Sequence, residues 1–353
     1  MSTVLMKGNE AIGEAAIRAG CKAYFGYPIT PQTEVLEYMS KRMPKLGRVF
    51  VQAESELGAI NMVYGAACAG ERVMTSTSSP GFSLMQETVS YIACSMVPAV
   101  LVNITRGGPG LGNIQPAQSD YFQMTKGGGH GDYRAITLAP ATIQEVVDHV
   151  VLAFELADKY RQLVMVMADG MIGQMMEPVE LPEMAEPQRP DLSWALTGAK
   201  DRPKNVVTSL FLGAANLEKI NLQLQELYKE IEANEVRYEE YMLEDADIVI
   251  VAYGTAGRIV QTAVKHAREM GIKAGLFRPV TVYPFPYAQL NEVASRAKQV
   301  MVVEMSAGQM LEDVRLATRD AKPIRFFGKL GGVVPLPEDV LQEIKAVANQ
   351  AAT

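Results

Sequence analysis

The chain has 353 residues, a length for which two domains are the usual expectation. Its formal net charge is −7, and the lysines and arginines are scattered, so nothing provides the basic face that a nucleic-acid-binding protein needs. The sequence contains no run of about 18 apolar residues that could span a bilayer and no basic-then-apolar signal pattern at its start. We therefore expect a cytoplasmic protein that binds neither nucleic acid nor a membrane.

The three cysteines, Cys21, Cys68 and Cys94, are far apart, and each lies in an apolar stretch. No Cys-x-x-Cys pair is present, so this chain is not expected to ligate an iron-sulfur cluster or a cysteine-rich zinc site by itself. Buried thiols are the simplest interpretation.

The first half of the chain alternates short apolar strands with helices. Strands are expected near residues 22, 48, 72, 98, 135 and 163, with helices between most of them. This alternation is typical of a doubly wound parallel sheet, in which ligands bind at the carboxyl ends of the strands. The turns that follow these strands are therefore the places to search for functional residues.

The first such turn is rich in proline. After the strand at 22–25, Pro28-Ile29-Thr30-Pro31 leads into a helix that is expected to continue to about residue 45. The Thr30 hydroxyl is then presented at the sheet edge, where it could meet a ligand or cap the helix. The spacing alone does not decide between these two roles.

The second turn carries carboxylates. Glu54 and Glu56 follow the strand at 48–51, and a helix expected over 57–69 contains many small residues, so that another backbone could approach it closely.

The strand at 72–77 ends in Ser78-Ser79-Pro80-Gly81, before a helix expected from about Phe82. Hydroxyl and N–H groups at this helix start suit a polar ligand, but a plain strand–helix unit with an N-cap serine explains the same residues.

A long loop over residues 106–120 follows the apolar strand at 98–104. Arg106 is the cation at the mouth of this loop, where it could bind a carboxylate or phosphate or pair with a neighbouring acid. A second glycine cluster, at 126–133, contains His130, which has few local packing partners and could be either functional or structural.

The second half contains a linker, a long helix and a further α/β unit. Residues 173–191 are rich in Pro, Glu and Met and indicate a linker, and 217–244 is expected to form one long charged helix that leans on a neighbour. From residue 246, strands expected at 247–252, 273–277, 299–304 and 324–326 alternate with helices near 258–270, 287–297, 307–319 and 338–350. The glycine turn after the first of these strands lacks the third glycine of a dinucleotide-binding fingerprint.

Taken together, these segments resemble one family, the α-type subunits of 2-oxoacid:ferredoxin oxidoreductases, over nearly the whole chain. The resemblance is closest to the type that acts on 2-oxoisovalerate (3-methyl-2-oxobutanoate). It rests on these motifs in this order: Tyr27-Pro28-Ile29-Thr30-Pro31, Glu54-Ser55-Glu56, Ser79-Pro80-Gly81-Phe82, Arg106-Gly107-Gly108-Pro109-Gly110, His130-Gly131-Asp132-Tyr133, Pro284-Phe285-Pro286 and Val303-Glu304.

The resemblance implies an α/β fold in three parts. Residues 1–185 would form the pyrimidine-binding type of domain found in thiamine diphosphate enzymes, 186–245 a linker with the long charged helix, and 246–353 a domain like the transketolase C-terminal domain.

The resemblance also implies a cofactor shared between subunits. This chain would hold the aminopyrimidine of thiamine diphosphate, while a β-type subunit would supply the diphosphate and Mg²⁺ site, because the family's Gly-Asp-Gly…Asn segment is absent here. The [4Fe-4S] clusters would belong to other chains, among γ-type and ferredoxin-like subunits, with ferredoxin as electron acceptor and coenzyme A as co-substrate.

The family pattern further implies roles for individual residues. Glu56 would be the catalytic carboxylate that meets the cofactor ring, and Thr30, Arg106 and His130 would bind the substrate. Contacts to the cofactor would also come from Pro28, Ile29, Ser79, Pro80 and Phe82.

The loop at 111–121 resembles the branched-chain type, and Leu111 and Ile114 would suit an apolar substrate chain. A 2-oxoglutarate enzyme is the alternative substrate class. Two other possibilities are a self-sufficient transketolase-like enzyme, against which the absent diphosphate segment argues, and a non-catalytic scaffold subunit of the same complex.

Overall fold

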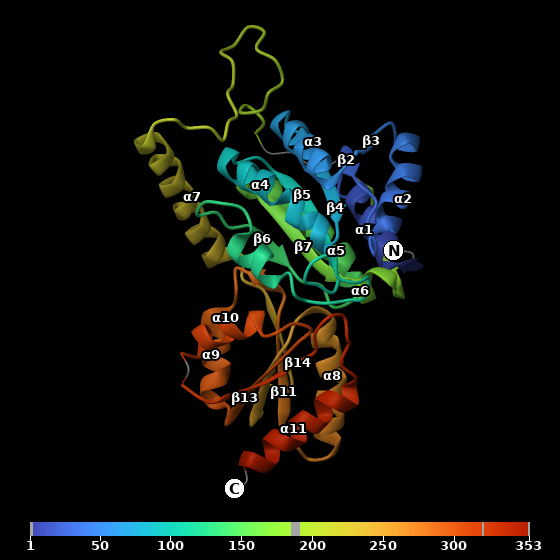
Figure 1. The fold of residues 1–353 in the computed structure, drawn as a ribbon, viewed down its shortest axis with the longest axis vertical. Coiled ribbons are helices and arrows are strands. Elements are labelled where there is room, and N and C mark those ends of the chain that lie inside the picture. Colours follow the sequence, from blue (N-terminus) through green and yellow to red (C-terminus); the bar gives the residue numbers. More distant parts are fainter. Residues whose placement is uncertain (1–2, 185–190, 320, 352–353) are drawn as a thin grey trace.

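The computed structural model describes residues 3–184, 191–319 and 321–351. Figure 1 shows two α/β domains, one above the other, with the N-terminal half of the chain in the upper domain and the C-terminal end at the bottom of the lower one. Within the described ranges, no helix combines the length and the apolar composition needed to cross a bilayer.

The first domain is built on a seven-stranded sheet with the order β12-β6-β7-β5-β4-β2-β3. Its strands are β2 (Ala23–Gly26), β3 (Val49–Gln52), β4 (Val73–Thr77), β5 (Ala99–Thr105), β6 (Ile136–Leu138), β7 (Leu163–Asp169) and β12 (Thr281–Tyr283). All neighbouring pairs are parallel except β12 with β6. The expected doubly wound parallel sheet is therefore confirmed.

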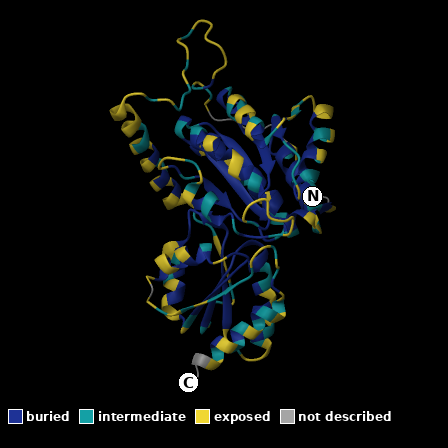
Figure 2. Cartoon of the chain, viewed as in Figure 1, coloured by how far each residue is buried: buried dark blue, intermediate teal, exposed yellow. Residues whose placement is uncertain are grey.

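Helices cover both faces of this sheet. One face carries α3 (Glu56–Cys68) and α4 (Ser79–Ser95), and the other carries α1 (Gly8–Arg18), α2 (Thr33–Arg42) and α5 (Ile143–Tyr160). Alternate residues of the buried strand β5 point to opposite faces, so that Leu101 packs with α3 and α4 whereas Val102 packs with α1 and α5. The central strands β5 and β7 are accordingly buried along their length, whereas the edge strand β3 is partly exposed (Figure 2).

The second domain contains a five-stranded sheet with the order β14-β13-β10-β11-β9. Its strands are β9 (Tyr238–Tyr241), β10 (Ile248–Val251), β11 (Ala274–Pro279), β13 (Gln299–Glu304) and β14 (Ile324–Gly328), of which only β9 is antiparallel to its neighbour. Helices α8 (Gly254–Glu269) and α11 (Pro337–Ala351) cover one face, and α9 (Tyr287–Arg296) and α10 (Gln309–Thr318) cover the other.

The remaining elements are α6 (Gly170–Gln174), a 3₁₀ turn (Pro44–Leu46), a π-helical turn (Gln123–Gly127), β1 (Thr3–Lys7) and β8 (Met176–Glu180). The last two form an antiparallel pair. The prediction of a linker over 173–191 was therefore wrong for 176–180, and 185–190 lie outside the described residues.

The long charged helix is shorter than predicted. Helix α7 (Ala214–Asn234) packs beside α4 and buries only Leu224, Tyr228 and Ile231. The predicted end at residue 244 was wrong, because the chain turns at Glu235 and forms β9 in the second sheet. Strand β12 comes after residue 246 in the chain but joins the first sheet. Each sheet therefore contains one strand from the other side of the domain boundary expected at residue 246.

Ion pairs and hydrogen bonds of charged side chains hold the two domains together. The guanidinium of Arg278 donates to both carboxylate oxygens of Glu145 on α5, at 2.9 and 2.6 Å. On α10, the buried carboxylate of Asp313 accepts a hydrogen bond of 2.6 Å from Tyr121 of the first domain. Two-point contacts of this kind fix orientation, so the two domains share a defined arrangement.

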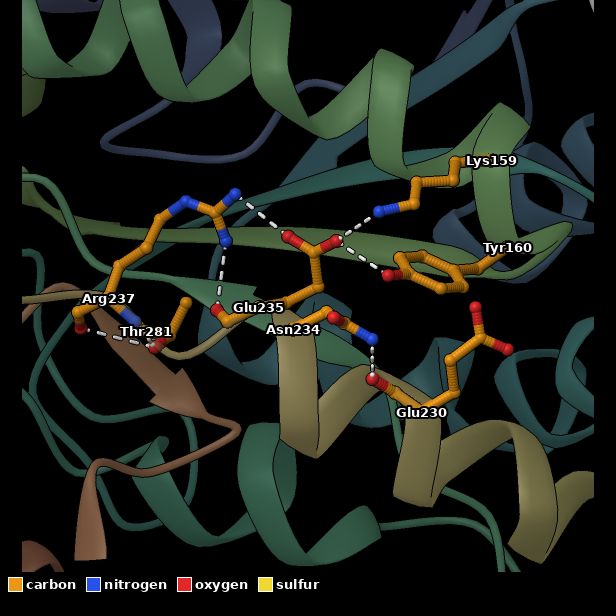
Figure 3. A network of polar contacts seen from close by, with 7 residues as sticks. All are labelled: Lys159, Tyr160, Glu230, Asn234, Glu235, Arg237 and Thr281. Carbon is orange, nitrogen blue, oxygen red and sulfur yellow. Dashed lines mark hydrogen bonds and ion pairs between the residues drawn. The ribbon is translucent and has the colours of Figure 1, made fainter. Parts of the chain in front are cut away.

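Glu235 anchors the end of α7 to the first domain (Figure 3). Its Oε1 accepts hydrogen bonds from Lys159 Nζ at 2.7 Å and Tyr160 OH at 2.6 Å, and its Oε2 accepts one from Arg237 Nη2 at 2.8 Å. Burial opposes ionisation of Glu235, but these three donors outweigh that cost and lower its pKa. The carboxylate is therefore the charged centre of a three-donor network.

This network predicts an acid-dependent loss of stability. Because the folded pKa is lowered, Glu235 stabilises the fold above the unfolded carboxyl pKa of about 4.3, and the effect is lost as the pH falls through the folded value. Glu235→Gln is expected to lower the free energy of unfolding at pH 7 by roughly 1.5–3 kcal/mol. Urea unfolding at a series of pH values measures this difference, which should shrink in acid.

Glu226→Gln is the matched control, because Glu226 pairs with Lys229 on an exposed face of the same helix. Its cost at pH 7 is expected to stay below about 1 kcal/mol. A Glu235→Gln deficit that is the same at every pH would contradict the role given to the carboxylate charge.

Candidate functional site

The predicted site residues follow the carboxyl ends of four neighbouring strands. Strand order places β5, β4, β2 and β3 side by side. The turns after these strands carry Arg106, Ser79, the segment Pro28–Pro31 and Glu56, respectively. The fold therefore brings most of the predicted residues to one edge of the sheet, where open α/β sheets bind ligands.

Glu56 is the first residue of α3, and only 7% of it is exposed. Its side chain lies over Gly81, where a β-carbon would come within 2.6 Å of Glu56 Oε1 and 2.3 Å of Thr77 Oγ1. No hydrogen bond or ion pair joins Glu56 to another residue within the described part of the chain. Glu54 is exposed instead and lies over Gly58, so the start of the helix turns these two carboxylates apart.

Arg106 is buried at the mouth of its loop, with 7% of it exposed. Its Nη1 donates to the carbonyl of Thr30 at 2.7 Å and its Nη2 to the carbonyl of Leu111 at 2.9 Å, whereas Nε is buried without a partner. The alternative of a surface arginine paired with an acid is therefore wrong. An unused, buried N–H of a cation suits an anionic ligand.

Thr30 is exposed and adjoins Arg106 through its carbonyl. It does not cap α2, whose N-cap residue is Gln32. The capping alternative is therefore wrong. Pro28 and Ile29 are half-buried in the same turn, which Gln32 closes through hydrogen bonds to Ile29 and Tyr27.

The start of α4 differs from the sequence prediction. The helix begins at Ser79 rather than near Phe82, and the half-buried Pro80 lies in its first turn. The N-cap residue Ser78 makes no capping hydrogen bond, and the Ser79 N–H donates instead to Asn103 Oδ1 at 3.0 Å. The N-cap serine alternative is therefore wrong, because the side chain of Asn103 on β5 takes that role.

Asp120 completes this end of the sheet. Its Oδ2 accepts hydrogen bonds from Ser79 Oγ at 2.6 Å and Asn103 Nδ2 at 2.8 Å. Burial raises the pKa of Asp120, while these hydrogen bonds and the charge of Arg106 act in the opposite direction. The sequence interpretation missed both Asn103 and Asp120. A polar Asn inside an apolar strand was the signal for the first, and Asp120 at the end of the 106–120 loop carried none.

A cleft of about 500 Å³ lies between the domains beside these residues. The start of α4 and the 106–110 loop form one wall, and residues of the second domain form the other; the lining residues are Ser79, Pro80, Ser83, Arg106, Gly107, Gly108, Pro109, Gly110, Ser119, Asp120, Gln123, Met305, Ser306, Ala307, Gln309, Leu330 and Gly331. The lining combines polar side chains with apolar ones such as Met305 and Leu330, and Arg106 is the only cation among the described residues that line the cleft.

Of the predicted residues, Ser79, Pro80 and Arg106 line this cleft, whereas six lie outside its lining: Pro28, Ile29, Thr30, Glu56, Phe82 and His130. Phe82 is fully buried in the core between α4 and the sheet. His130 is exposed in the glycine loop, where neighbouring Gly129 contacts Gln86 in the middle of α4. Among the residues that the structure describes, no group of three or more His, Cys, Asp or Glu side chains could hold a metal ion.

Comparison with known proteins agrees with this arrangement. Residues 14–245 match the family described as "Pyruvate flavodoxin/ferredoxin oxidoreductase, thiamine diP-bdg", and residues 246–340 match "Pyruvate:ferredoxin oxidoreductase core domain II". The chain is 52% identical to the ketoisovalerate oxidoreductase subunit VorB of Methanothermobacter marburgensis, over 99% of both chains. It is 38% identical to the 2-oxoglutarate synthase subunit KorA of Methanothermobacter thermautotrophicus, over 96% of this chain and 97% of that one.

A solved structure is similar over most of this chain. The 2-oxoglutarate:ferredoxin oxidoreductase from Magnetococcus marinus, solved with 2-oxoglutarate, coenzyme A and succinyl-CoA bound, superposes with a TM-score of 0.88 at 28% identity. The match covers 98% of this chain and 65% of the matched chain of that enzyme. The chain therefore belongs to the 2-oxoacid:ferredoxin oxidoreductases, as an α-type subunit.

Proposed function

We propose that the complex formed by this chain and its partner subunits decarboxylates a branched-chain 2-oxoacid, 2-oxoisovalerate, in the presence of coenzyme A. The products are CO₂ and the acyl-CoA, and two electrons pass singly to ferredoxin. The observation that carries the proposal is the buried Arg106, whose free Nε lies at the carboxyl ends of the strands beside Thr30 and Leu111.

The residues around Glu56 fit the aminopyrimidine of thiamine diphosphate. Only 7% of Glu56 is exposed and no described residue donates to its carboxylate, so the oxygens are available to accept a ligand N–H. Glu56 would accept a hydrogen bond from a ring nitrogen, and the absence of a side chain at Gly81 keeps its carboxylate in place. When bound, thiamine diphosphate would supply a nucleophilic carbon and take up the electron pair that CO₂ leaves behind.

Arg106 and Thr30 would hold the substrate carboxylate. The guanidinium is oriented by two carbonyls, so its three remaining N–H groups have fixed directions, and the exposed Thr30 adds a hydroxyl beside them. A charge-assisted contact of this kind is strong in a buried setting. Arg106 is buried and oriented by two carbonyls, which favours it over the exposed His130 as the carboxylate-binding group.

A branched apolar substrate suits the loop next to Arg106. Leu111 is 80% exposed and Ile114 is 55% exposed, and the backbone of Ile114 lies near Gly170 and Pro31. Large apolar side chains that are exposed gain free energy when a ligand or partner covers them. Among the described cleft residues, Arg106 is the single cation, which leaves no second cation there for the distal carboxylate of 2-oxoglutarate.

Other subunits would supply the rest of the reaction. We assign the diphosphate and Mg²⁺ site to a β-type subunit and the [4Fe-4S] clusters to further chains, among γ-type and ferredoxin-like subunits. The composition supports this division, because the three cysteines of this chain occur singly.

The test is a substrate series with the whole complex. The chain is co-purified with the subunits that accompany it, and kcat/KM is measured for 2-oxoisovalerate, 2-oxoglutarate and pyruvate with coenzyme A and a low-potential acceptor. We expect 2-oxoisovalerate to exceed 2-oxoglutarate by at least about 10-fold, the amount that one or two well-placed apolar groups provide. A higher value for 2-oxoglutarate would reject the substrate assignment, and activity of this chain alone would indicate a self-sufficient enzyme.

A further inference from the structure

Asp120 is a buried acid at the wall of the cleft for which the proposed reaction has no use. Only 6% of it is exposed, and a carboxylate in such a place is costly unless its hydrogen bonds are well made. Its Oδ2 accepts two of them, from Ser79 and Asn103. The question is what these contacts accomplish at the edge of the site.

The direction of each hydrogen bond in this group is fixed. Ser79 has one hydroxyl hydrogen, and the 2.6 Å contact to Asp120 uses it, since the alternative acceptor, the Arg106 carbonyl, is 3.3 Å away. The Ser79 oxygen is then free to accept the backbone N–H of Arg106, at 2.9 Å. Asn103 is oriented in the same way, because its oxygen accepts the Ser79 N–H and its Nδ2 must therefore face Asp120.

The chain of contacts ends on the guanidinium that is proposed to bind the substrate. Ser79 fixes the backbone of Arg106, and the carbonyls of Thr30 and Leu111 fix its two terminal nitrogens. Only Nε is left without a partner. Each terminal nitrogen also keeps one unused N–H, so a shift of the Arg106 backbone would redirect all the free donors of the guanidinium.

We propose that Asp120 is a positioning residue for Arg106 and acts through the Ser79 hydroxyl, an inference that rests on the proposed role of Arg106 in binding the substrate carboxylate. Asp120 does not touch the substrate. It is the terminal acceptor that sets the orientation of Ser79, and Ser79 in turn holds the segment from which the guanidinium projects.

Kinetics of the whole complex separate this role from plain structural support. Asp120→Ala and Ser79→Ala are each expected to raise KM for the 2-oxoacid about 10-fold, the effect of losing one oriented hydrogen bond. In Asp120→Ala, the values of kcat and of KM for coenzyme A should change less than about 2-fold. Ser79→Ala is compared through KM for the 2-oxoacid only, because the family pattern also places Ser79 at the cofactor. Because both residues act in one chain, the double variant should be no worse than the poorer single variant.

Asp120→Asn refines the test, because an amide oxygen can accept the same two hydrogen bonds without the charge. We expect its KM to stay within about 3-fold of the parent value. Asp158→Asn is the stability control. It breaks the buried pair with Arg72, 2.8 Å long and located at the opposite end of the sheet, and should lower the Tm without changing KM.

Three results would overturn the inference: an unchanged KM in Asp120→Ala, an unchanged KM in Ser79→Ala, or a double variant whose effect is the product of the two single effects. If Asp120→Ala does not fold, two comparisons decide the question. The first is Ser79→Ala against the parent complex, and the second is the double variant Asp120→Asn/Ser79→Ala against Asp120→Asn. Arg106→Lys is measured beside them. If it leaves KM for the 2-oxoacid unchanged, the proposed role of Arg106 fails first, which distinguishes that failure from a failure of Asp120 alone.

Discussion

Replacing Glu56 by glutamine is expected to lower kcat of the assembled complex by about 100-fold or more, equivalent to at least about 2.7 kcal/mol of transition-state stabilisation. Glutamine has the same size but cannot carry the charge or exchange the proton of a carboxylate. Since no described residue donates a hydrogen bond to Glu56, the variant breaks no contact of the folded chain. The measurement is steady-state turnover together with the Tm, which should change little.

Glu54→Gln is the matched control, because Glu54 is two residues away, carries the same charge and is exposed. It should retain turnover within about 2-fold. If Glu56→Gln also retains full turnover in a correctly assembled complex, the chain acts as a scaffold and the catalytic assignment of Glu56 is rejected.

Gly81→Ala is expected to remove activity to a similar extent while leaving the fold nearly unchanged. The new methyl group would lie 2.6 Å from Glu56 Oε1 and 2.3 Å from Thr77 Oγ1, closer than atoms can approach. The Glu56 carboxylate can rotate away, whereas Glu56 Cγ, which would lie at 2.8 Å, and the buried, β-branched Thr77 must shift slightly, at a modest cost to stability. The carboxylate of Glu56 would then leave its position, and turnover should fall about 100-fold, as in Glu56→Gln.

Gly65→Ala controls for the exchange of glycine by alanine. Gly65 lies in α3, and a β-carbon there would meet no other atom within 4 Å. In the purified chain this substitution should raise the free energy of unfolding by up to about 1 kcal/mol.

Retained turnover in Gly81→Ala would contradict the close packing of Glu56 on Gly81. A large fall of the Tm would show that the neighbours cannot move aside.

The strands and the turns after them could be predicted because their signals are local. Apolar runs such as 98–104 mark buried parallel strands. The polar residues that follow these strands lie at the ligand-binding edge of the sheet, whatever the order of the strands in it. For this reason the positions of Glu56, Thr30 and Arg106 at that edge could be predicted from the sequence, while their roles stay predictions that the family resemblance implies. The direction in which Glu54 and Glu56 diverge was also predictable, because a helix begins between them.

Contacts between distant segments could not be predicted in the same way. The hydrogen bond that Ser79 donates to Asp120 joins residues 41 positions apart, and nothing in the local sequence pattern indicates that pair. The end of α7 was mistaken for a similar reason. The residues after Asn234 are rich in glutamate, which favours a helix, but pairing of Tyr238–Tyr241 with β11 and the contacts of Glu235 override this propensity.

The exchange of β9 and β12 has a consequence for how the polypeptide matures. The outer edge of β6 is covered by Thr281–Tyr283, so the first sheet receives its last strand only after Tyr283 has left the ribosome. Until then the nascent chain presents an unpaired strand edge, of the kind that promotes self-association. A gene cut where the two family matches meet, at 245 and 246, would therefore encode two incomplete sheets rather than two independent domains.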